Sequence, residues 1–182
     1  RCHIINASFN RTNLTTGIAT AMLDSVPTVF ITGQVPSKLV GSDAFQETDV
    51  TGITLPITKH NWLVTEAGDI ARHVREAFVI AQNGRPGPVL IDITKDALQA
   101  TTEFVWPETV DLPGLSAAPL ADPKALARAA DLIAQAKRPL ILAGAGVIRS
   151  GATAALQQCV DRTGTPVALT LLGIGGFPQS HP

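Results

Sequence analysis

Two glycine-rich stretches follow predicted strands and have the residue types of a phosphate-binding turn. Gly144-Ala145-Gly146 closes the apolar run that starts at Pro139, and Gly173-Ile174-Gly175-Gly176 follows the apolar run 166–170. Glycine at such turns lets a pyrophosphate approach the backbone near a helix N-terminus, where free amides point outward. The full GxGxxG pattern is not met because position 149 is arginine, so a tight strand-to-helix turn remains the alternative. Two such turns at neighbouring strand ends favour a nucleotide-type ligand.

Two lysines and three acids stand in loops that follow predicted strands. Lys38 lies in the loop after the strand 28–32, and Lys95 comes shortly after the strand 89–93. Cations at the carboxyl ends of parallel strands can attract an anionic substrate, although a single lysine is more commonly solvated. The first loop also carries Asp43, Glu47 and Asp49. Their spacing specifies no metal site, so we expect solvated charges.

Histidine and cysteine give no specific signal. His60 lies in a tryptophan-containing segment and His73 in a predicted helix, so each is expected to be packed or at the surface. Cys2 and Cys159 have no metal-ligand spacing, which indicates two small buried hydrophobic residues rather than a disulfide or a zinc site. No Ser/His/Asp or Cys/His arrangement has supporting context. We therefore assign no metal ligand.

Helical and strand patterns alternate along the chain. Apolar residues recur at three- and four-residue steps in the predicted helices 12–25, 66–82, 123–137 and 152–162. Apolar runs predict buried strands at 28–32, 89–93, 139–143 and 166–170. The β-branched stretch 53–64, which Pro56 interrupts, predicts short extended pieces. This order is typical of an α/β fold in which parallel sheets carry helices on both faces.

The segment 101–121 contains prolines and small residues with no visible period, and we predict that it is an interdomain linker. It separates a domain at 1–100 from a second one at 122–182. Asp122 and Pro123 have the types of an N-cap and a first helical residue, so a helix should begin directly after the linker.

Composition excludes several classes of protein. Of the 182 residues, 45% are hydrophobic and 16% charged, and the net charge is −1. Without a Lys/Arg stripe, nucleic acid is not an expected partner. No apolar run reaches the roughly 18 to 20 residues that a membrane span requires, so the expected location is the cytoplasm.

Five stretches form a specific combination: TGIATAMLDSVP at 16–27, ITGQVP at 31–36, GSDAFQE at 41–47, PITKHN at 56–61 and GRPGPVLIDITKD at 84–96. Together they closely resemble the catalytic subunits of the acetolactate synthase family, which depend on thiamine diphosphate. GRPGPV alone resembles thiamine enzymes at large, whereas DAFQE together with PITKHN points to this family. The resemblance covers residues 12–182. It implies that 1–100 is the latter part of the pyrimidine-binding thiamine diphosphate domain, and that 122–182 opens a Rossmann-like central domain that binds FAD.

The resemblance also implies site residues. It places Phe45 and Gln46 at the active site, with Gln46 close to thiamine diphosphate. It lines the substrate channel with Pro36, Lys38, Ala44 and Lys95. It lines FAD with Arg85, Gly144, Ala145, Gly146, Thr170, Leu171 and Leu172. The implied transferase reaction decarboxylates pyruvate and joins the two-carbon unit to a second 2-oxo acid, in branched-chain amino acid biosynthesis. A homodimer or tetramer, with a possible regulatory subunit, is also implied.

The chain departs from the family at identifiable positions. The family has Gly-Pro-Gly-Ala where Ser8-Phe9-Asn10-Arg11 stands here, and Phe and Arg cannot copy a glycine turn. Ser37 and Lys38 replace a pair that is often arginine-rich, and lysine lacks the bidentate fork of arginine. The glutamate that activates the cofactor and the motif that binds Mg²⁺ are not found within the sequence. We therefore expect an internal fragment that is inactive alone.

Two alternatives remain open at this point. The first is another thiamine diphosphate carboligase or oxidase, such as glyoxylate carboligase or pyruvate oxidase. The second is a non-catalytic α/β nucleotide-binding module, which the altered turn at 8–11 favours.

Overall fold

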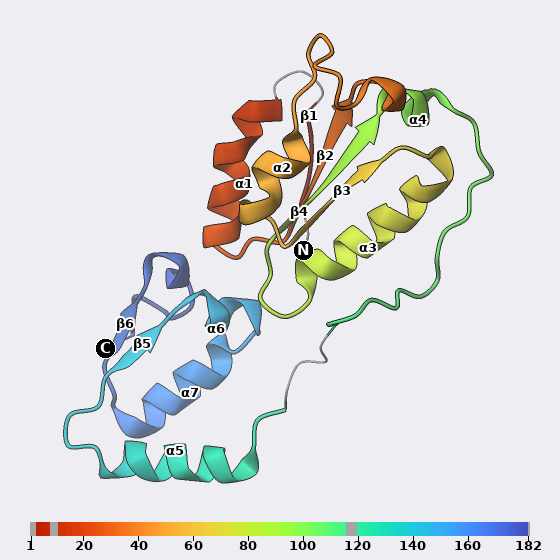
Figure 1. The fold of residues 1–182 in the computed structure, drawn as a ribbon. Coiled ribbons are helices and arrows are strands. Elements are labelled where there is room, and N and C mark those ends of the chain that lie inside the picture. The colour runs from red at the N-terminus through yellow and green to blue at the C-terminus, as the bar shows by residue number, and fades with distance from the viewer. Residues whose placement is uncertain (1–2, 8–10, 116–119, 182) are drawn as a thin grey trace. The chain divides into compact units, whose positions relative to one another are not determined.

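The computed structural model describes residues 3–7, 11–115 and 120–181. The chain divides into two compact units, Arg1–Pro119 and Leu120–Pro182, each with its own sheet (Figure 1). The division falls within the segment 101–121, but the three domain bounds given above stay a prediction. Within the described residues, no helix is long and apolar enough to cross a membrane.

The first unit is built on a four-stranded parallel sheet with the order β1-β2-β4-β3. Its strands are β1 His3–Ala7, β2 Thr28–Gln34, β3 His60–Val64 and β4 Pro88–Thr94. β2 and β4 are central and pair in register from Thr28↔Pro88 to Gln34↔Thr94. β4 is buried along its whole length, as its continuous apolar run predicts.

Helices cover both faces of this sheet, which confirms the predicted α/β fold class (Figure 1). On one face, α1 Leu14–Leu23 and α2 Val50–Thr54 contribute to a core with Phe30 and Leu90. On the other, α3 Ile70–Gln82 packs against alternate residues of the same two strands. The predicted apolar face of α3 lies on this core, with Ala77 and Ala81 fully buried. The alternation of side chains along each strand thus separates the two cores.

Short helical turns connect these elements. They are η1 Arg11–Asn13, η2 Ser37–Leu39, η3 Leu55–Ile57, η4 Ala67–Asp69 and the five-residue helix α4 Lys95–Gln99. After α3, Asn83 is the C-cap and Gly84 has φ +58°, the left-handed conformation that glycine adopts most readily at this position.

The prediction of extended pieces at 53–64 is wrong for the first half of that stretch, which is helical in α2 and η3. The Asp49 carboxylate caps α2 by accepting from the Gly52 amide at 2.8 Å, and Pro56 occupies an early turn position that needs no N–H. Asn61, at the start of β3, donates to the Thr51 carbonyl at 2.7 Å and to the Thr54 hydroxyl at 2.9 Å. These local caps outweigh the β-branched composition.

Lys59 joins two of the stretches that carry the resemblance. Its amide donates to the Pro88 carbonyl at 2.8 Å, and its ammonium group donates to the carbonyls of Ile80 and Asn83 at the end of α3. Its stem covers Gly87, where an added Cβ would lie 3.1 Å from Lys59 Cγ and Cδ. Burial lowers the pKa of Lys59. The PITKHN and GRPGPV stretches are therefore one packing unit that holds α3 against β4.

The second unit is built on a two-stranded parallel sheet. Its elements are α5 Pro123–Gln135, β5 Ile141–Ala143, α6 Ala145–Arg149, α7 Thr153–Thr163, β6 Val167–Leu169 and η5 Leu171–Gly173. As predicted, Asp122 caps α5 by accepting from the Lys124 amide at 3.0 Å, with Pro123 in the first turn. The strand predicted from Pro139 ends at Ala143, and Gly144 is the N-cap of α6.

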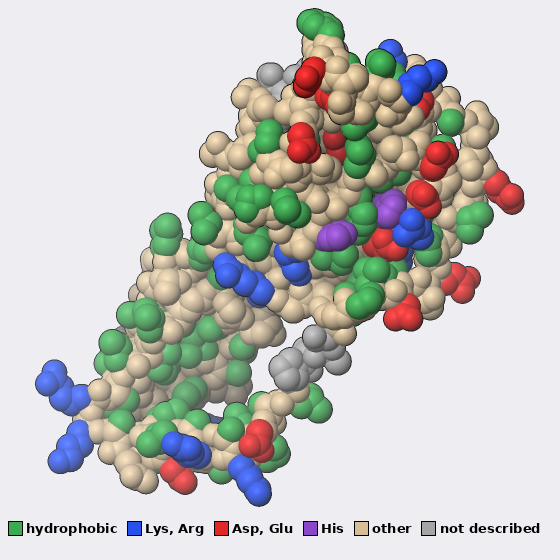
Figure 2. Space-filling model, in the orientation of Figure 1, with side chains coloured by type: hydrophobic (Ala, Val, Ile, Leu, Met, Phe, Trp, Pro, Cys, Tyr) green, Lys and Arg blue, Asp and Glu red, His purple; other side chains and the backbone are tan. Residues whose placement is uncertain are grey.

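Large apolar side chains stay exposed on the second unit, as the green areas in Figure 2 show. They include Leu126, Leu132, Leu140, Leu142 and Leu171. Cys159 is exposed too, so the prediction that it is buried is wrong. Two short strands present too little surface to cover the far side of α7, on which Cys159 lies. Cys2 lies outside the described residues.

A buried polar cluster crosses the two central strands near their carboxyl ends. Asp92 on β4 is 1% exposed. Its carboxylate accepts from the Thr32 hydroxyl at 2.7 Å and from the side-chain Nε2 of Gln34 at 3.0 Å. The same Gln34 nitrogen donates to the Thr48 carbonyl at 2.8 Å, and Gln34 Oε1 accepts from the Val35 amide. A buried carboxylate requires such donors, because its desolvation is otherwise uncompensated. The cluster therefore fixes both ends of the loop that follows β2.

Thr32→Val should destabilise the first unit by about 1–3 kcal/mol, because it removes a donor to a buried carboxylate without changing side-chain shape. The measurement is denaturant unfolding followed by tryptophan fluorescence, since Trp62 and Trp106 both lie in this unit. The matched control is Thr20→Val, which removes an exposed hydroxyl bonded within α1 and should change stability by less than about 0.5 kcal/mol. Equal effects of the two substitutions would contradict the role given to Asp92.

Candidate functional site

The loop from Val35 to Thr48 lies at the carboxyl end of β2, at the edge where open parallel sheets bind ligands (Figure 1). It contains five of the predicted site residues: Pro36, Lys38, Ala44, Phe45 and Gln46. A sixth, Lys95, begins α4 at the end of the neighbouring β4. The parallel register brings these two segments to the same edge.

Glu47 organises the loop from within. Its carboxylate accepts from the amides of Gly41 and Ala44, the latter at 2.9 Å. These hydrogen bonds hold the pKa of Glu47 below its usual value. Asp49 is exposed, as predicted for a solvated charge, but both carboxylates also have a structural role, Glu47 within the loop and Asp49 as a helix cap. The sequence patterns used above revealed neither the hydrogen bonds of Glu47 within the loop nor the helix cap formed by Asp49.

The residues that the resemblance assigns to catalysis lie where the loop backbone is least relaxed. Asp43 and Gln46 have φ values of +55° and +64°, in the left-handed region that costs a non-glycine residue free energy. Phe45 between them is 89% exposed. Strain of this kind persists only where surrounding contacts impose it, and here Glu47 imposes it. The loop thus presents Phe45 and Gln46 outward from the sheet edge.

A two-bond clamp ties this loop to α4. The Ser37 amide donates to Asp96 Oδ1 at 3.0 Å, and the Ser37 hydroxyl donates to Oδ2 at 2.5 Å. The Ser37 hydroxyl is the largest cause that holds the pKa of Asp96 well below its usual range. The buried Thr94 hydroxyl also acts on this charge without meeting the geometry of a full hydrogen bond. Lys38 and Lys95 adjoin the clamp, and both are exposed.

Arg85 lies at the opposite, amino end of the same sheet, just before β4. Its Nε donates to the Ser25 hydroxyl at 2.7 Å, and its Nη2 donates to the Leu23 carbonyl at 3.1 Å and the Met22 carbonyl at 3.4 Å. The guanidinium group thereby caps the C-terminus of α1. The structure does not bring Arg85 together with Phe45 and Gln46.

The remaining predicted residues gather at the strand ends of the second unit. Thr170 follows β6, and an added Cβ at Gly144 would lie 3.5 Å from its hydroxyl. Gly173 packs against the other turn, because a Cβ there would lie 2.5 Å from the Ala143 carbonyl oxygen. Gly146 has nothing within 4 Å of such a Cβ. The two glycine turns are therefore neighbours, and Gly146 faces open space.

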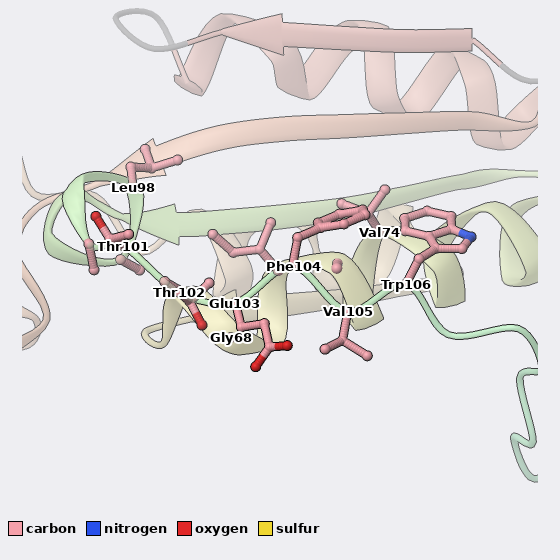
Figure 3. A pocket seen from close by; sticks show the side chains of 14 residues that line it. Gly68, Val74, Leu98, Thr101, Thr102, Glu103, Phe104, Val105 and Trp106 are labelled. Carbon is pink, nitrogen blue, oxygen red and sulfur yellow. The ribbon is translucent and has the colours of Figure 1, made fainter.

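An apolar cavity of about 560 Å³ lies elsewhere in the first unit, between α3 and the extended segment that follows α4 (Figure 3). Figure 3 shows Phe104 and Trp106 on one side of this segment and Val105 on the other. The rings of Phe104 and Trp106 stack at 6.4 Å. Glu103 is the only ionisable residue in its lining. The cavity therefore offers apolar contact and little chemistry.

His60 and His73 form a packed cluster with Trp62. The Trp62 ring lies 4.4 Å from His60 and 5.1 Å from His73, and His73 Nδ1 lies 3.1 Å from the Glu76 carboxylate. Figure 2 shows histidine side chains beside acidic and basic ones on this face. Burial is the main cause that lowers the pKa of His60. Among the residues that the structure describes, no group of three His, Cys, Asp or Glu could hold a metal ion.

Family comparisons agree with this architecture. Residues 3–53 match the N-terminal TPP binding domain of thiamine pyrophosphate enzymes, and residues 126–182 match the central domain of the same enzymes. The acetolactate synthase large subunit of Corynebacterium glutamicum is 51% identical over 170 residues, which are 93% of this chain. A probable large subunit from Methanocaldococcus jannaschii is 48% identical, and acetolactate synthase 1, chloroplastic, from Zea mays is 47% identical, each over 94% of this chain.

The chain belongs to the acetolactate synthase family. It spans 27–29% of the length of these three relatives. The fold class and the family that the sequence predicts are therefore confirmed. The site residues stay predictions, because they follow from the resemblance alone. The altered turn at Ser8-Phe9-Asn10 lies outside the described residues.

Four residues that position the loop after β2 were missed by sequence reasoning. Thr32 and Asp92 lie in predicted strands, Gln34 lies just after one, and Asp96 was given no role. The only available signal was the position of Asp92 in an otherwise apolar buried strand. An acid at such a position is expected to have buried hydrogen-bond partners.

Glu47→Gln should loosen the loop, because one amide oxygen cannot replace a carboxylate that accepts from two backbone N–H groups. We expect hydrogen exchange at the Gly41 and Ala44 amides to accelerate roughly tenfold, as measured by NMR or mass spectrometry. Asp43→Asn is the matched control, because asparagine tolerates the left-handed backbone and the substitution keeps the Asp43 backbone amide, which acts on the Glu47 carboxylate.

The same loop should respond to acid. Because the folded-state pKa of Glu47 is lowered, its stabilisation is present above the ordinary glutamate pKa and is lost as pH falls through the lowered value. Exchange at Gly41 should therefore accelerate, beyond its intrinsic pH dependence, only below about pH 4. Protection that is unchanged at the lowest pH of the folded protein would show that another contact closes the loop.

Proposed function

We propose that the protein carrying this chain is an acetolactate synthase. This transferase decarboxylates pyruvate and joins the two-carbon unit to a second 2-oxo acid, pyruvate or 2-oxobutyrate. The observation that supports the proposal is identity near 50% over 93% of the chain to acetolactate synthases, in a fold whose strained loop stands at the ligand-binding edge. We propose thiamine diphosphate, Mg²⁺ and FAD as its cofactors, and branched-chain amino acid biosynthesis as its role.

The loop would provide contacts rather than bond-making groups. Thiamine diphosphate, when bound, supplies an electron sink for the decarboxylation. Gln46, held outward by the strained backbone, can orient a polar group of substrate or cofactor, and Phe45 can exclude water from it. Pro36 and Ala44 shape the apolar wall of the channel. Lys38 and Lys95 supply positive charge for the carboxylate of a 2-oxo acid.

Of the two glycine turns in the second unit, the turn at Gly146 leaves room for a dinucleotide, whereas the glycine at 173 is required by packing. The open space at Gly146 permits backbone approach by a flat or phosphorylated group, and Thr170 lies against Gly144 in the same turn. Gly173, by contrast, is explained by its packing against Ala143. Arg85 belongs to the first unit, where its Nε and Nη2 cap α1, and its role in FAD binding stays a prediction.

The described residues include no cluster fit to ligate Mg²⁺, so no step of the reaction is assigned to such a ligand here. A homodimer or tetramer, a regulatory subunit and a cytoplasmic location stay predictions. So do the assignments of 1–100 to the pyrimidine-binding domain and of 122–182 to the FAD domain.

Gln46→Ala in the product of the complete reading frame should lower kcat/KM for pyruvate by roughly 10- to 100-fold. The assay follows acetolactate formation with thiamine diphosphate, Mg²⁺ and FAD. Gln82→Ala, an exposed glutamine at the other end of the sheet, should leave activity unchanged. A folded wild-type protein without acetolactate formation would refute the proposal and favour a related thiamine enzyme or a binding module.

Gly146→Ala and Gly173→Ala should separate ligand approach from folding. Gly173→Ala should destabilise the second unit by about 1–3 kcal/mol, because its Cβ would collide with backbone. Gly146→Ala should change stability by less than about 1 kcal/mol and should weaken FAD binding. Thermal unfolding and titration of FAD fluorescence provide the two measurements. Normal FAD affinity in a stable Gly146→Ala protein would remove this turn from the proposed site.

A further inference from the structure

The two exposed lysines at the sheet edge are linked through their neighbours in the chain. Lys38 directly follows Ser37 in η2, and Lys95 directly precedes Asp96 in α4. The last register pair of the central strands, Gln34↔Thr94, starts both segments from the same edge. Beyond the strands, the Ser37–Asp96 clamp is a side-chain contact that joins them. The clamp thus sets how far apart the backbones of the two lysines lie.

The clamp geometry fixes orientation as well as distance. One residue donates to both oxygens of one carboxylate, through its amide at 3.0 Å and its hydroxyl at 2.5 Å. A single hydrogen bond would leave the carboxylate free to rotate, whereas two parallel bonds do not. The hydrogen bonds also keep Asp96 ionised, as its lowered pKa indicates.

The clamp also determines which groups the negatively charged Asp96 carboxylate contacts. An unrestrained carboxylate beside two lysines would form ion pairs with them and would compete with any bound anion. Here its oxygens face the neutral donors of Ser37. Within the described part of the chain, neither Lys38 nor Lys95 takes part in an ion pair. Both ammonium groups therefore remain available to an external anion.

We propose that Ser37 and Asp96 form a positioning pair, which holds Lys38 and Lys95 as a joint site for the carboxylate of a 2-oxo acid. This inference rests on the proposed function for the identity of the anion. Ser37 and Asp96 do not touch the substrate. They act by fixing the two segments that bear the cations and by keeping the Asp96 carboxylate from those cations.

Lysine acetylation footprinting tests the pair directly. The complete protein is treated briefly with an acetylating reagent at increasing pyruvate concentrations, and each lysine is quantified by mass spectrometry. Pyruvate should protect Lys38 and Lys95 with one shared half-saturation concentration. Lys124, exposed on α5, is the internal control for general effects of pyruvate on amines. Absence of protection, or protection of one lysine alone, would overturn the proposal.

Ser37 variants supply the decisive comparison, because they leave every charge in place. Ser37→Ala should raise the half-saturation concentration roughly five- to tenfold, and Ser37→Thr, which keeps the hydroxyl, should restore it. Ser42→Ala is the matched control, since that hydroxyl bonds to the Leu39 carbonyl within the same loop. Identical footprints of wild type and Ser37→Ala would overturn the proposal.

Steady-state kinetics on the same variants separate positioning from general loss of structure. Ser37→Ala should raise KM for pyruvate with kcat little changed, whereas a merely damaged loop would lower both kcat and the folded fraction. The footprint requires no turnover, so it remains readable if the wild-type protein forms no acetolactate. The absence of acetolactate formation would reject the proposed function. The footprint would still test whether the Ser37–Asp96 clamp positions Lys38 and Lys95 for anion binding.

Discussion

The buried Asp92 carboxylate is the constraint on which the first unit depends. It lies in a strand that is otherwise apolar and fully buried, so its charge must be balanced by hydrogen-bond donors within the protein. Thr32 and Gln34 provide them from the neighbouring strand, which fixes the alignment of β2 against β4. Gln34 then reaches the Thr48 carbonyl and so fixes the loop that carries the proposed active-site residues. The need of the buried Asp92 carboxylate for hydrogen-bond donors thereby determines the geometry of the loop at the sheet edge.

The elements with a strong local pattern could be predicted from the sequence. The apolar residues of α3, from Ile70 to Ala81, recur at helical spacing and lie on the core, and the mostly apolar run in β4 indicates a strand buried on both faces. The cap at Asp122 and the left-handed Gly84 were equally local. In each case the residues that decide the structure lie within a few positions of one another.

The rest of the site could not be predicted, because its contacts join distant positions. Ser37 and Asp96 are 59 residues apart, and Thr32 and Asp92 are 60 apart. The helical stretch after Asp49 was missed because capping and a contact from Asn61 override β-branched composition. The resemblance identified the family but did not separate contact residues from structural ones. Lys59, in one of its most specific stretches, holds α3 against β4 and points to no ligand.

The anchoring of the loop at both ends has a consequence for how this enzyme family can diverge. Ser37 is bound to α4 and Thr48 to the sheet, whereas the residues between them are held chiefly by Glu47. The free energy of closing a loop depends only weakly on its length, so residues can be inserted between fixed ends at small cost. Substitutions and length changes within 38–46 would alter the shape of the loop without reaching the core. The molecule therefore separates the part that must stay constant to fold from the part of the sheet edge that can vary in sequence and length.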